Sequence, residues 1–313
     1  MGEDNNLTAT RSPKITCRRS ERTENILGTL MACAPFVGYV LFSLIPMALS
    51  LYLSFTDLKG FNIFDSAFIW IDNYKRLFKM EHFYLSIGIT LYWSLNVPIN
   101  LAISLFLANL LTKPVKCGKF VRSVLFIPTV CSTVAVTLMW QWILDPGYGI
   151  INTMLAAIGL PKIGFTSTAG WFMPSALLIS VWMRGTNIVL MQSALANVDA
   201  SLKEAARIDG AREIRVFWSV TFPSITPTLF YLLITRFTAS FSEVGLMQVI
   251  TNNGVGPGYM ALTLSYYMYR MGYINIYSEG LGLACACAWV MAIAIIVFTR
   301  LNFKLADRWV CYD

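Results

Sequence analysis

The sequence predicts an all-α integral membrane protein with six transmembrane helices, and two observations lead to this fold class. The first is composition, because 56% of the 313 residues are hydrophobic and only 13% are charged. An ordinary soluble domain contains a larger share of charged residues. The second is that the charges are segregated, so that long segments contain none or almost none. Together these observations place most of the chain inside a membrane.

Six segments of low charge can each supply the ~20 apolar residues that a helix needs to cross a hydrocarbon core of ~30 Å. They are residues 25–56, 83–112, 123–144, 163–198, 216–250 and 280–299. Membrane-spanning β-strands would be about half as long and would alternate in polarity. We therefore predict one six-helix domain over residues 26–305, with a basic tail at 1–25 and a short tail at 306–313. An apolar first segment this long indicates an uncleaved anchor rather than a signal peptide.

The Lys and Arg residues predict the orientation of the helices. With the N-terminus placed inside, 16 of the 24 lie on the inner side and 6 on the outer side. Cytoplasmic loops are enriched in these residues, so both termini are predicted to be cytoplasmic in a multi-pass protein. The net charge of +7 is then a consequence of orientation and does not require a nucleic-acid partner.

The cysteines and the single histidine give no sign of a disulfide framework, a metal site or a catalytic centre. On the predicted topology none of the seven cysteines lies in an outer loop. His82 is the only histidine in the chain, so we predict no metal site. We also predict no catalytic residue and no cofactor bound by this chain.

The connection after the fourth segment predicts a short cytoplasmic helix. Ser201 followed three residues later by Glu204 forms a capping box, which places the helix start at Leu202. Asp209-Gly210 is a stop signal, because glycine readily adopts a left-handed conformation. The centre of the helix, Ala205-Ala206, leaves a narrow surface that another protein could grip. An ordinary amphipathic connector on the membrane surface fits the same pattern.

A longer pattern begins in this helix. It reads Glu204-Ala205-Ala206, three residues, Gly210, nine residues, and then Val220-Thr221-Phe222-Pro223. This resembles the EAA loop of ABC importer permeases, in which Ile-x-Leu-Pro stands at the end. Ile208-Asp209-Gly210-Ala211 is similar to the carbohydrate branch of that family, as is the stretch from Ile127 to Asn152. The outer stretch from Thr251 to Pro257 is similar to that branch as well, but Asn253 and Val255 interrupt its glycine pattern.

The resemblance implies a type I importer permease fold in the inner membrane of a prokaryote. The short helix, at about residues 201–210, would be the coupling helix that contacts cytoplasmic ATPase subunits. The implied coupling residues are Glu204, Ala205, Ala206, Asp209 and Gly210. The chain has no phosphate-loop motif, so ATP and Mg would be bound by the separate ATPase. A second homologous permease subunit and an extracytoplasmic solute-binding protein would be the other partners.

Three charged residues inside the predicted spans indicate a solute path, because such charges usually face a cavity or a partner. They are Arg184, Arg236 and Glu243. Arg236 and Glu243 are seven residues apart, which would place them on one face of the fifth helix. A structural ion pair, or a position near the outer boundary, would explain them equally well. The resemblance implies substrate contacts at Trp182, Met183, Thr186, Arg236, Ala239, Ser240 and Glu243.

The predicted solute is a sugar or oligosaccharide, because an indole beside hydroxyl and charged groups suits such molecules. A charged or phosphorylated solute such as glycerol phosphate is the alternative, since a guanidinium group pairs with phosphate or carboxylate. A stand-alone secondary transporter is the alternative from another class. A structural or receptor-like membrane protein would carry no solute at all.

Overall fold

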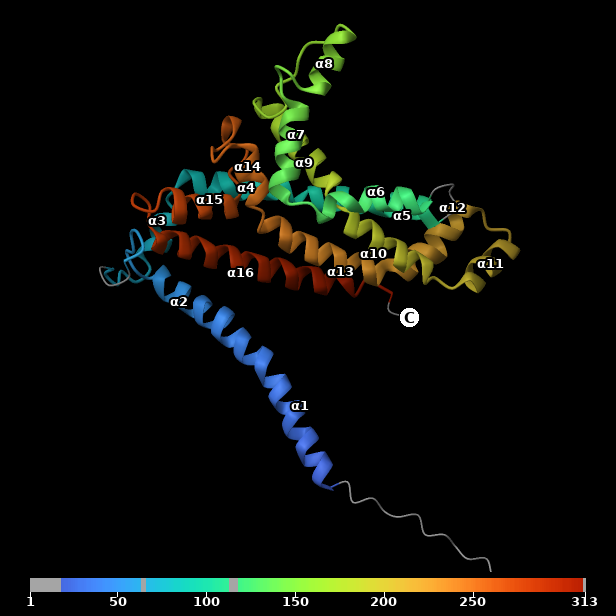
Figure 1. The fold of residues 1–313 in the computed structure, drawn as a ribbon, viewed down its shortest axis with the longest axis horizontal. Helices are drawn as coiled ribbons and strands as arrows, with labels where there is room; N and C mark the ends of the chain where they lie inside the picture. Colours follow the sequence, from blue (N-terminus) through green and yellow to red (C-terminus); the bar gives the residue numbers. More distant parts are fainter. Residues whose placement is uncertain (1–17, 63–65, 113–117, 312–313) are drawn as a thin grey trace, which may run out of the picture. The chain divides into compact units, whose positions relative to one another are not determined.

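The computed structural model describes residues 18–62, 66–112 and 118–311, and these residues are mainly helical (Figure 1). An isolated bridge pairs Thr56 with Phe68. The chain divides into two units, Met1–Tyr52 and Leu53–Asp313. Most of the predicted basic tail, residues 1–17, lies outside the described residues.

The first unit contains most of the first predicted span. Helix α1 (Arg18–Tyr39) continues through the π-helical turn η1 (Val40–Leu44) into α2 (Ile45–Ser54). Residues Asn25–Ser54 form an apolar run of 30 residues, long enough to cross a membrane. The π-helical turn ends two residues before Pro46, which has no N–H to donate to the carbonyl of Phe42. The proline therefore accounts for the local change in helical winding.

Three further predicted spans are confirmed in the second unit. Helices α4 (Glu81–Ser94) and α5 (Asn96–Thr112) form an apolar span of 32 residues with a break at Leu95. A second span, Glu213–Phe241, ends with α13 (Phe222–Phe241). The third is the single long helix α16 (Leu281–Ala306). Each satisfies the length requirement of a membrane-crossing helix.

The third predicted span is not one continuous helix. Helix α6 (Gly118–Val130) and helix α7 (Thr133–Leu144) meet at an angle of 105°. Pro128 lies in the last turn of α6, where proline removes a backbone donor. Ser132 then adopts an extended conformation, with ψ of 135°, as the N-cap of α7. Hydropathy predicted the apolar segment correctly, but it carries no information about this backbone break.

The fourth predicted span is also divided. Helix α9 (Ala169–Trp182) ends before Arg184, and α10 (Gly185–Ala196) begins directly after it. Among the described residues, four helices are long and apolar enough to cross a membrane, or five when the bent pair counts as one span. The predicted number of six transmembrane helices therefore stays a prediction.

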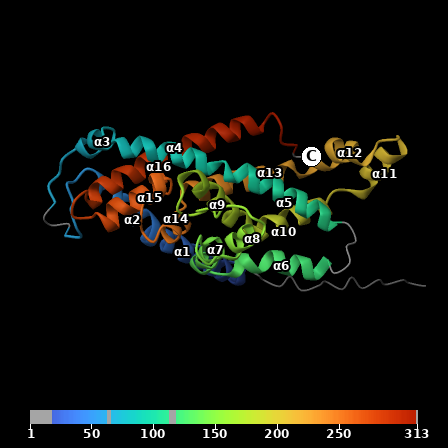
Figure 2. The same cartoon turned by 90° about the horizontal axis from the view of Figure 1, so that it is seen from above.

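Helices α5, α10 and α13 pack against one another and lie side by side in both views (Figures 1 and 2). Their shared core consists of buried aliphatic side chains, including those of Val97, Leu101, Met191, Leu195, Ile225 and Leu232. Helix α6 packs against α10 at Gly185, where an added Cβ would lie 2.4 Å from the carbonyl oxygen of Leu125. Only glycine allows this close approach of the two backbones.

The remaining elements are short and connect or cover the long helices. They are α3 (Asp72–Leu77), α8 (Ile150–Ala157), α11 (Ala200–Ile208), α12 (Glu213–Val216), η3 (Phe217–Thr221), α14 (Gly245–Ile250), η4 (Pro257–Tyr259), α15 (Leu264–Tyr269) and η5 (Arg270–Ile274). A second buried core, which includes Trp93, Phe172, Met247, Tyr266 and Leu283, joins α4, α9, α14, α15 and α16.

Candidate functional site

The predicted coupling helix is present as α11, but its start differs from the predicted one. The N-cap is Asp199, whose carboxylate accepts the backbone N–H of Ser201 at 2.9 Å. The helix therefore begins at Ala200, and the predicted capping box of Ser201 and Glu204 is wrong. Hydrogen bonds from Ser201 also hold the pKa of Asp199 below its usual value. A charged acceptor at this position additionally interacts favourably with the helix dipole.

The helix ends as the sequence predicted. Gly210 has φ of +80°, and its N–H donates to the carbonyl of Arg207 at 3.0 Å. The N–H of Ala211 donates to the carbonyl of Ala206 at 3.0 Å. These two bonds define a Schellman motif, which requires a left-handed residue at the position of Gly210. The turn directs the chain from α11 into α12.

The predicted coupling residues are available at the surface. Glu204, Ala205, Asp209 and Gly210 are exposed, and Ala206 is half-buried. Ile208, on the same helix, is 86% exposed, which sequence reasoning did not single out. Large apolar side chains on a charged helix were the available signal, and Leu202 on α11 is 54% exposed as well; interfaces are anchored by such side chains among polar neighbours.

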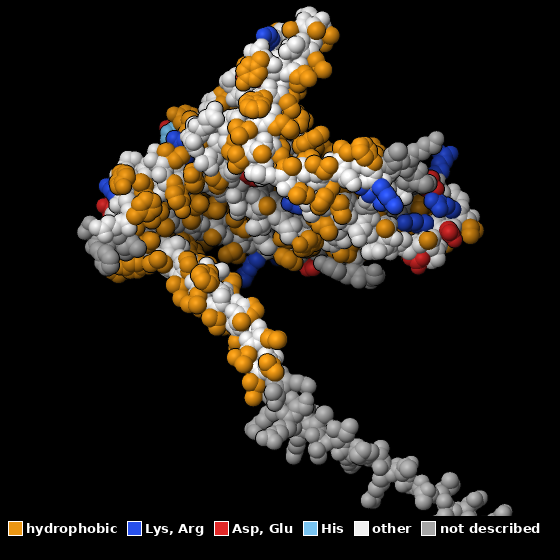
Figure 3. All heavy atoms as spheres, viewed as in Figure 1, with side chains coloured by type: hydrophobic (Ala, Val, Ile, Leu, Met, Phe, Trp, Pro, Cys, Tyr) orange, Lys and Arg blue, Asp and Glu red, His pale blue; other side chains and the backbone are white. Residues whose placement is uncertain are grey.

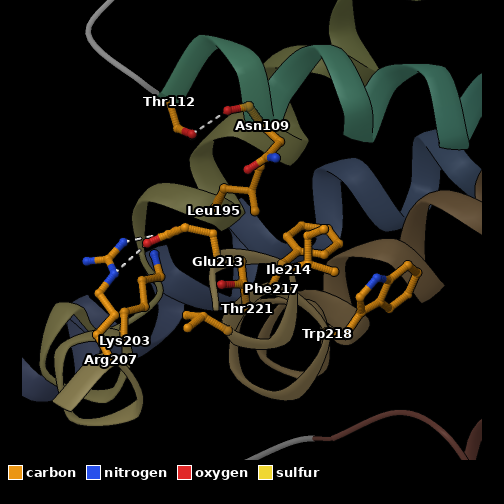
Figure 4. Close-up of a pocket in the computed structure, with 11 residues that line it drawn as sticks. Asn109, Thr112, Leu195, Lys203, Arg207, Glu213, Ile214, Phe217, Trp218 and Thr221 are labelled. Atoms are coloured by element: carbon orange, nitrogen blue, oxygen red, sulfur yellow. Dashed lines mark hydrogen bonds and ion pairs between the residues drawn. The ribbon is translucent and has the colours of Figure 1, made fainter. Parts of the chain in front are cut away.

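Helix α11 is tied to the start of the fifth span by a bidentate ion pair. Nε of Arg207 lies 2.8 Å from Oε1 of Glu213, and Nη2 lies 3.2 Å from Oε2 (Figure 4). The Glu213 carboxylate raises the pKa of Arg207 above its usual value. Because both groups are exposed, the pair contributes little to stability, but it bridges the Gly210 turn and links α11 to α12.

A cleft of about 420 Å³ lies beside this ion pair, between α11, the start of the fifth span and the end of α5. Lys203, Arg207, Asn109 and Thr112 contribute polar groups to it (Figure 4). Lys and Arg side chains gather over this end of the second unit, where α11 and α12 lie (Figure 3). The sequence predicted that these loops lie on the inner side of the membrane.

The predicted solute-path residues on the fourth span lie at the break between α9 and α10. Trp182 is the last residue of α9, Met183 is its C-cap, and Arg184 is the N-cap of α10. Thr186 follows in the first turn of α10. Trp182 is 47% exposed, and its ring contacts that of Trp140 edge to face at 5.8 Å between centroids.

The predicted residues on the fifth span are divided between two elements. Arg236, Ala239 and Ser240 lie on α13, but Glu243 lies beyond its end at Phe241. The Glu243 carboxylate instead accepts the N–H of Leu246 at 2.9 Å, in the first turn of α14. The prediction that Arg236 and Glu243 share one helix face is therefore wrong. A spacing of seven residues places two side chains on one face only when a single helix contains both, and α13 ends at Phe241, before Glu243.

The intramembrane charges are nevertheless brought together from different segments. Arg184 lies within electrostatic range of both Arg236 and Glu243. Nε of Arg236 is buried and has no hydrogen-bond partner in the described part of the chain. The described residues contain no ion pair between Glu243 and either arginine.

Ser240 and Ala239 lie in different environments. Ala239 is exposed, whereas Ser240 is buried and its hydroxyl accepts from Nδ2 of Asn96 at 2.9 Å. Asn100 similarly donates to the hydroxyl of Ser180 at 3.2 Å. These asparagines link α5 to α9 and α13, and sequence reasoning missed them. The sequence feature that could have identified these contacts is the pair of amides four residues apart in a span without charges. Polar groups within membranes commonly join neighbouring helices.

The stretch from Thr251 to Pro257 borders a second, polar cleft of about 500 Å³, together with residues at the end of α7. Gln141 of α7 donates to the carbonyls of Val249 and Ile250 and so fixes α7 to α14. Asn252 and Asn253, with φ of 49° and 65°, occupy left-handed positions in this stretch. Asparagine tolerates that conformation better than most residues, so the turn forms although the predicted glycine pattern is interrupted.

Comparison with known proteins agrees with this arrangement. Residues 100–310 match the family described as "Binding-protein-dependent transport system inner membrane component". The "Probable ABC transporter permease protein YesP" of Bacillus subtilis is 30% identical over 299 residues, which cover 94% of this chain and 95% of YesP. The "sn-glycerol-3-phosphate transport system permease protein UgpA" of Yersinia pestis is 29% identical, with coverage of 87% and 91%.

The fold is also similar to that of a solved transporter. The chain matches a structure of a bacterial alginate ABC transporter in complex with an alginate pentasaccharide-bound periplasmic protein. The TM-score is 0.80, and the match covers 93% of this chain and 98% of the other. At 23% sequence identity, the likeness concerns the fold alone.

Proposed function

This chain belongs to the family of binding-protein-dependent transport system inner membrane components, and from this membership we propose that it forms one part of a membrane pore through which a separate ATPase drives uptake of a sugar-like solute. It is a permease subunit of an ABC importer, and relatives of this kind work with a solute-binding protein. The named relatives include a permease for sn-glycerol 3-phosphate.

The observation that carries the proposal is the exposed α11 and its direct connection to the fifth span. The coupling residues Glu204, Ala205 and Gly210 are at the surface, where a cytoplasmic ATPase can bind them. The Schellman turn and the Arg207–Glu213 ion pair connect α11 to α12. The same span continues into α13, which carries Arg236. Closure of the ATPase would thus move the helix that lines the proposed solute path.

The proposed partners follow from this mechanism. ATP and Mg bind to the ATPase subunits, and a second homologous permease subunit completes the pore. The solute-binding protein delivers the solute to the outer side. With α11 in the cytoplasm, the excess of Lys and Arg on the inner side supports cytoplasmic termini, in the inner membrane of a prokaryote.

The sequence left a charged solute open as an alternative to a neutral sugar, and the structure offers an observation that favours it. Arg184, at the break of the fourth span, and Arg236, on α13, lie within electrostatic range of each other. Two guanidinium groups suit a solute that carries a negative charge. A stand-alone secondary transporter, in contrast, would give no role to the exposed α11.

Co-purification tests the proposed function. The chain extracted from its native membrane should bring an ATPase subunit with it, identified by mass spectrometry. Glu204→Lys combined with Gly210→Asp should lose the ATPase or leave its hydrolysis uncoupled from uptake, because both changes alter the exposed face of α11. Lys75→Gln on α3 changes a surface charge elsewhere and serves as the control. If no ATPase associates with the wild-type chain, the proposal is wrong.

A further inference from the structure

We propose that the cleft between α11 and the start of the fifth span binds the phosphate headgroup of an anionic phospholipid of the inner leaflet, and that this lipid holds α11 in place for coupling. The binding of the lipid stands apart from the solute and its path. The effect on coupling rests on the proposed function, because it concerns the helix that contacts the ATPase.

The first argument is the depth of the cleft in the membrane. Asn109 and Thr112 line the cleft and lie at the end of the span Glu81–Thr112. Another wall comes from the first turns of the span Glu213–Phe241, through α12 and η3. Helices that cross a membrane end in its headgroup region. The cleft therefore lies at the level of the lipid headgroups, on the side that the excess of Lys and Arg predicts to be cytoplasmic.

The second argument is a surplus of positive charge. Lys203 and Arg207 are four residues apart on one face of α11, and both line the cleft. Among the described residues of the lining, the one carboxylate is that of Glu213, and Arg207 already binds it through two hydrogen bonds (Figure 4). Lys203 forms no ion pair within the described part of the chain. Its ammonium group is therefore available to an anion, and phosphate is a common ligand of lysine.

The third argument is the apolar rim, which suits a lipid better than a soluble anion. Ile214 and Trp218 line the cleft and are 76% and 61% exposed. The indole of Trp218 packs on the rings of Phe217 and Phe222, with centroids 5.4 Å and 5.0 Å away. Tryptophan is enriched at the headgroup level of membranes. Basic pockets between membrane helices on the cytoplasmic side bind anionic headgroups, and this rim adds a surface for the glycerol and acyl groups.

A lipid bound in this way would join three elements of the chain. Lys203 belongs to α11, Thr112 ends α5, and Trp218 belongs to η3 in the fifth span. The cleft volume of about 420 Å³ is within the range of ~300–1,000 Å³ that is typical of small-ligand sites. A phosphate on Lys203, with its acyl chains beside Trp218, would restrict the movement of α11 relative to the span. Coupling should therefore be stronger when anionic lipid is present.

Native mass spectrometry tests lipid binding to the detergent-purified complex, which is titrated with phosphatidylglycerol or with phosphatidylcholine of the same chain length. Wild type should retain phosphatidylglycerol at lower concentrations than phosphatidylcholine. Lys203→Gln should weaken the tightest phosphatidylglycerol binding about fivefold, because one cation is lost. Lys203→Arg keeps the charge and should retain this binding. Lys119→Gln is the matched control, since Lys119 is an exposed lysine of α6 that does not line the cleft.

ATP hydrolysis by the complete transporter tests the effect on coupling. The complex is placed in nanodiscs of phosphatidylcholine alone or of phosphatidylcholine mixed with phosphatidylglycerol. Phosphatidylglycerol should raise the hydrolysis rate of wild type. Lys203→Gln should lose most of this rise, whereas Lys119→Gln should keep it. A rise that is the same in wild type and Lys203→Gln would overturn the effect on coupling.

Four results would overturn the lipid site. They are equal binding of the two lipids by wild type, equal binding of phosphatidylglycerol by wild type and Lys203→Gln, complete displacement of the lipid by an equal concentration of inorganic phosphate, and loss of the ATPase from Lys203→Gln. The third would identify a soluble anion as the ligand, and the fourth would assign Lys203 to the ATPase interface. Absence of any ATPase from the wild-type preparation would instead overturn the proposed function, and lipid binding would then be measured on the permease alone.

Discussion

Replacing Gly210 with valine is expected to lower ATP-driven uptake by at least tenfold. Gly210 has φ of +80°, and an added Cβ would meet no atom within 4 Å. The effect therefore comes from backbone conformation alone. A β-branched residue is disfavoured there by about 1–2 kcal/mol or more, so the chain would leave the left-handed conformation. The Schellman turn would open, and α11 would change its direction relative to α12.

Gly210→Asn is the matched control for this prediction. Asparagine adopts the left-handed conformation more readily than valine, so this variant should retain much more uptake although its side chain is as large. Uptake and ATP hydrolysis are measured in the same vesicles, which separates loss of coupling from loss of the ATPase. Equal uptake by the valine and asparagine variants would show that the turn conformation has no role in coupling.

Replacing Gly185 with leucine is expected to produce the largest structural defect. An added Cβ would lie 2.4 Å from the carbonyl oxygen of Leu125 and 2.9 Å from Cα of Phe126. Because these are backbone atoms of α6, the side chain cannot be accommodated by a change of rotamer. Helices α6 and α10 would have to separate, at a cost of about 1–3 kcal/mol or more. Arg184 is the adjacent residue, so the solute path should be distorted as well.

Thermal unfolding in detergent and uptake in vesicles measure these two effects. Gly88→Ala is the control, because Gly88 lies inside α4 and an added Cβ there would meet no atom within 4 Å. It should leave the unfolding temperature nearly unchanged or slightly raised, since alanine is the better helix former. A Gly185→Leu variant with the unfolding temperature and uptake of wild type would contradict the close packing of α6 on α10.

Charge segregation predicted the long apolar helices well because burial in lipid acts on whole segments. The charge-free residues 83–112 became α4 and α5, and the segment 280–299 lies within α16 except for Gly280, its N-cap. Breaks within a segment depend on single residues, and hydropathy does not report them. Pro128 and Ser132 divide the third segment, and Arg184 marks the division of the fourth.

The candidate sites were predictable where local rules determine the backbone. Gly210 could be assigned to a left-handed turn because its role depends on neighbouring residues only. Glu243 was misplaced because the argument assumed that α13 continued past Phe241. The contact between Asn96 and Ser240 could not be predicted, because 144 residues separate them and tertiary packing alone brings them together. The proximity of Arg184 to Arg236 required the same tertiary information.

The source of energy for uptake tests the central claim most directly. Vesicles would contain either this chain with its partner permease, ATPase and binding protein, or this chain alone, and uptake of labelled solute would be measured. The proposed importer predicts uptake only by the complete complex and only with ATP on the side of α11, with no response to an imposed proton or sodium gradient. Uptake by the isolated chain driven by an ion gradient, without ATP, would contradict the account and identify a secondary transporter.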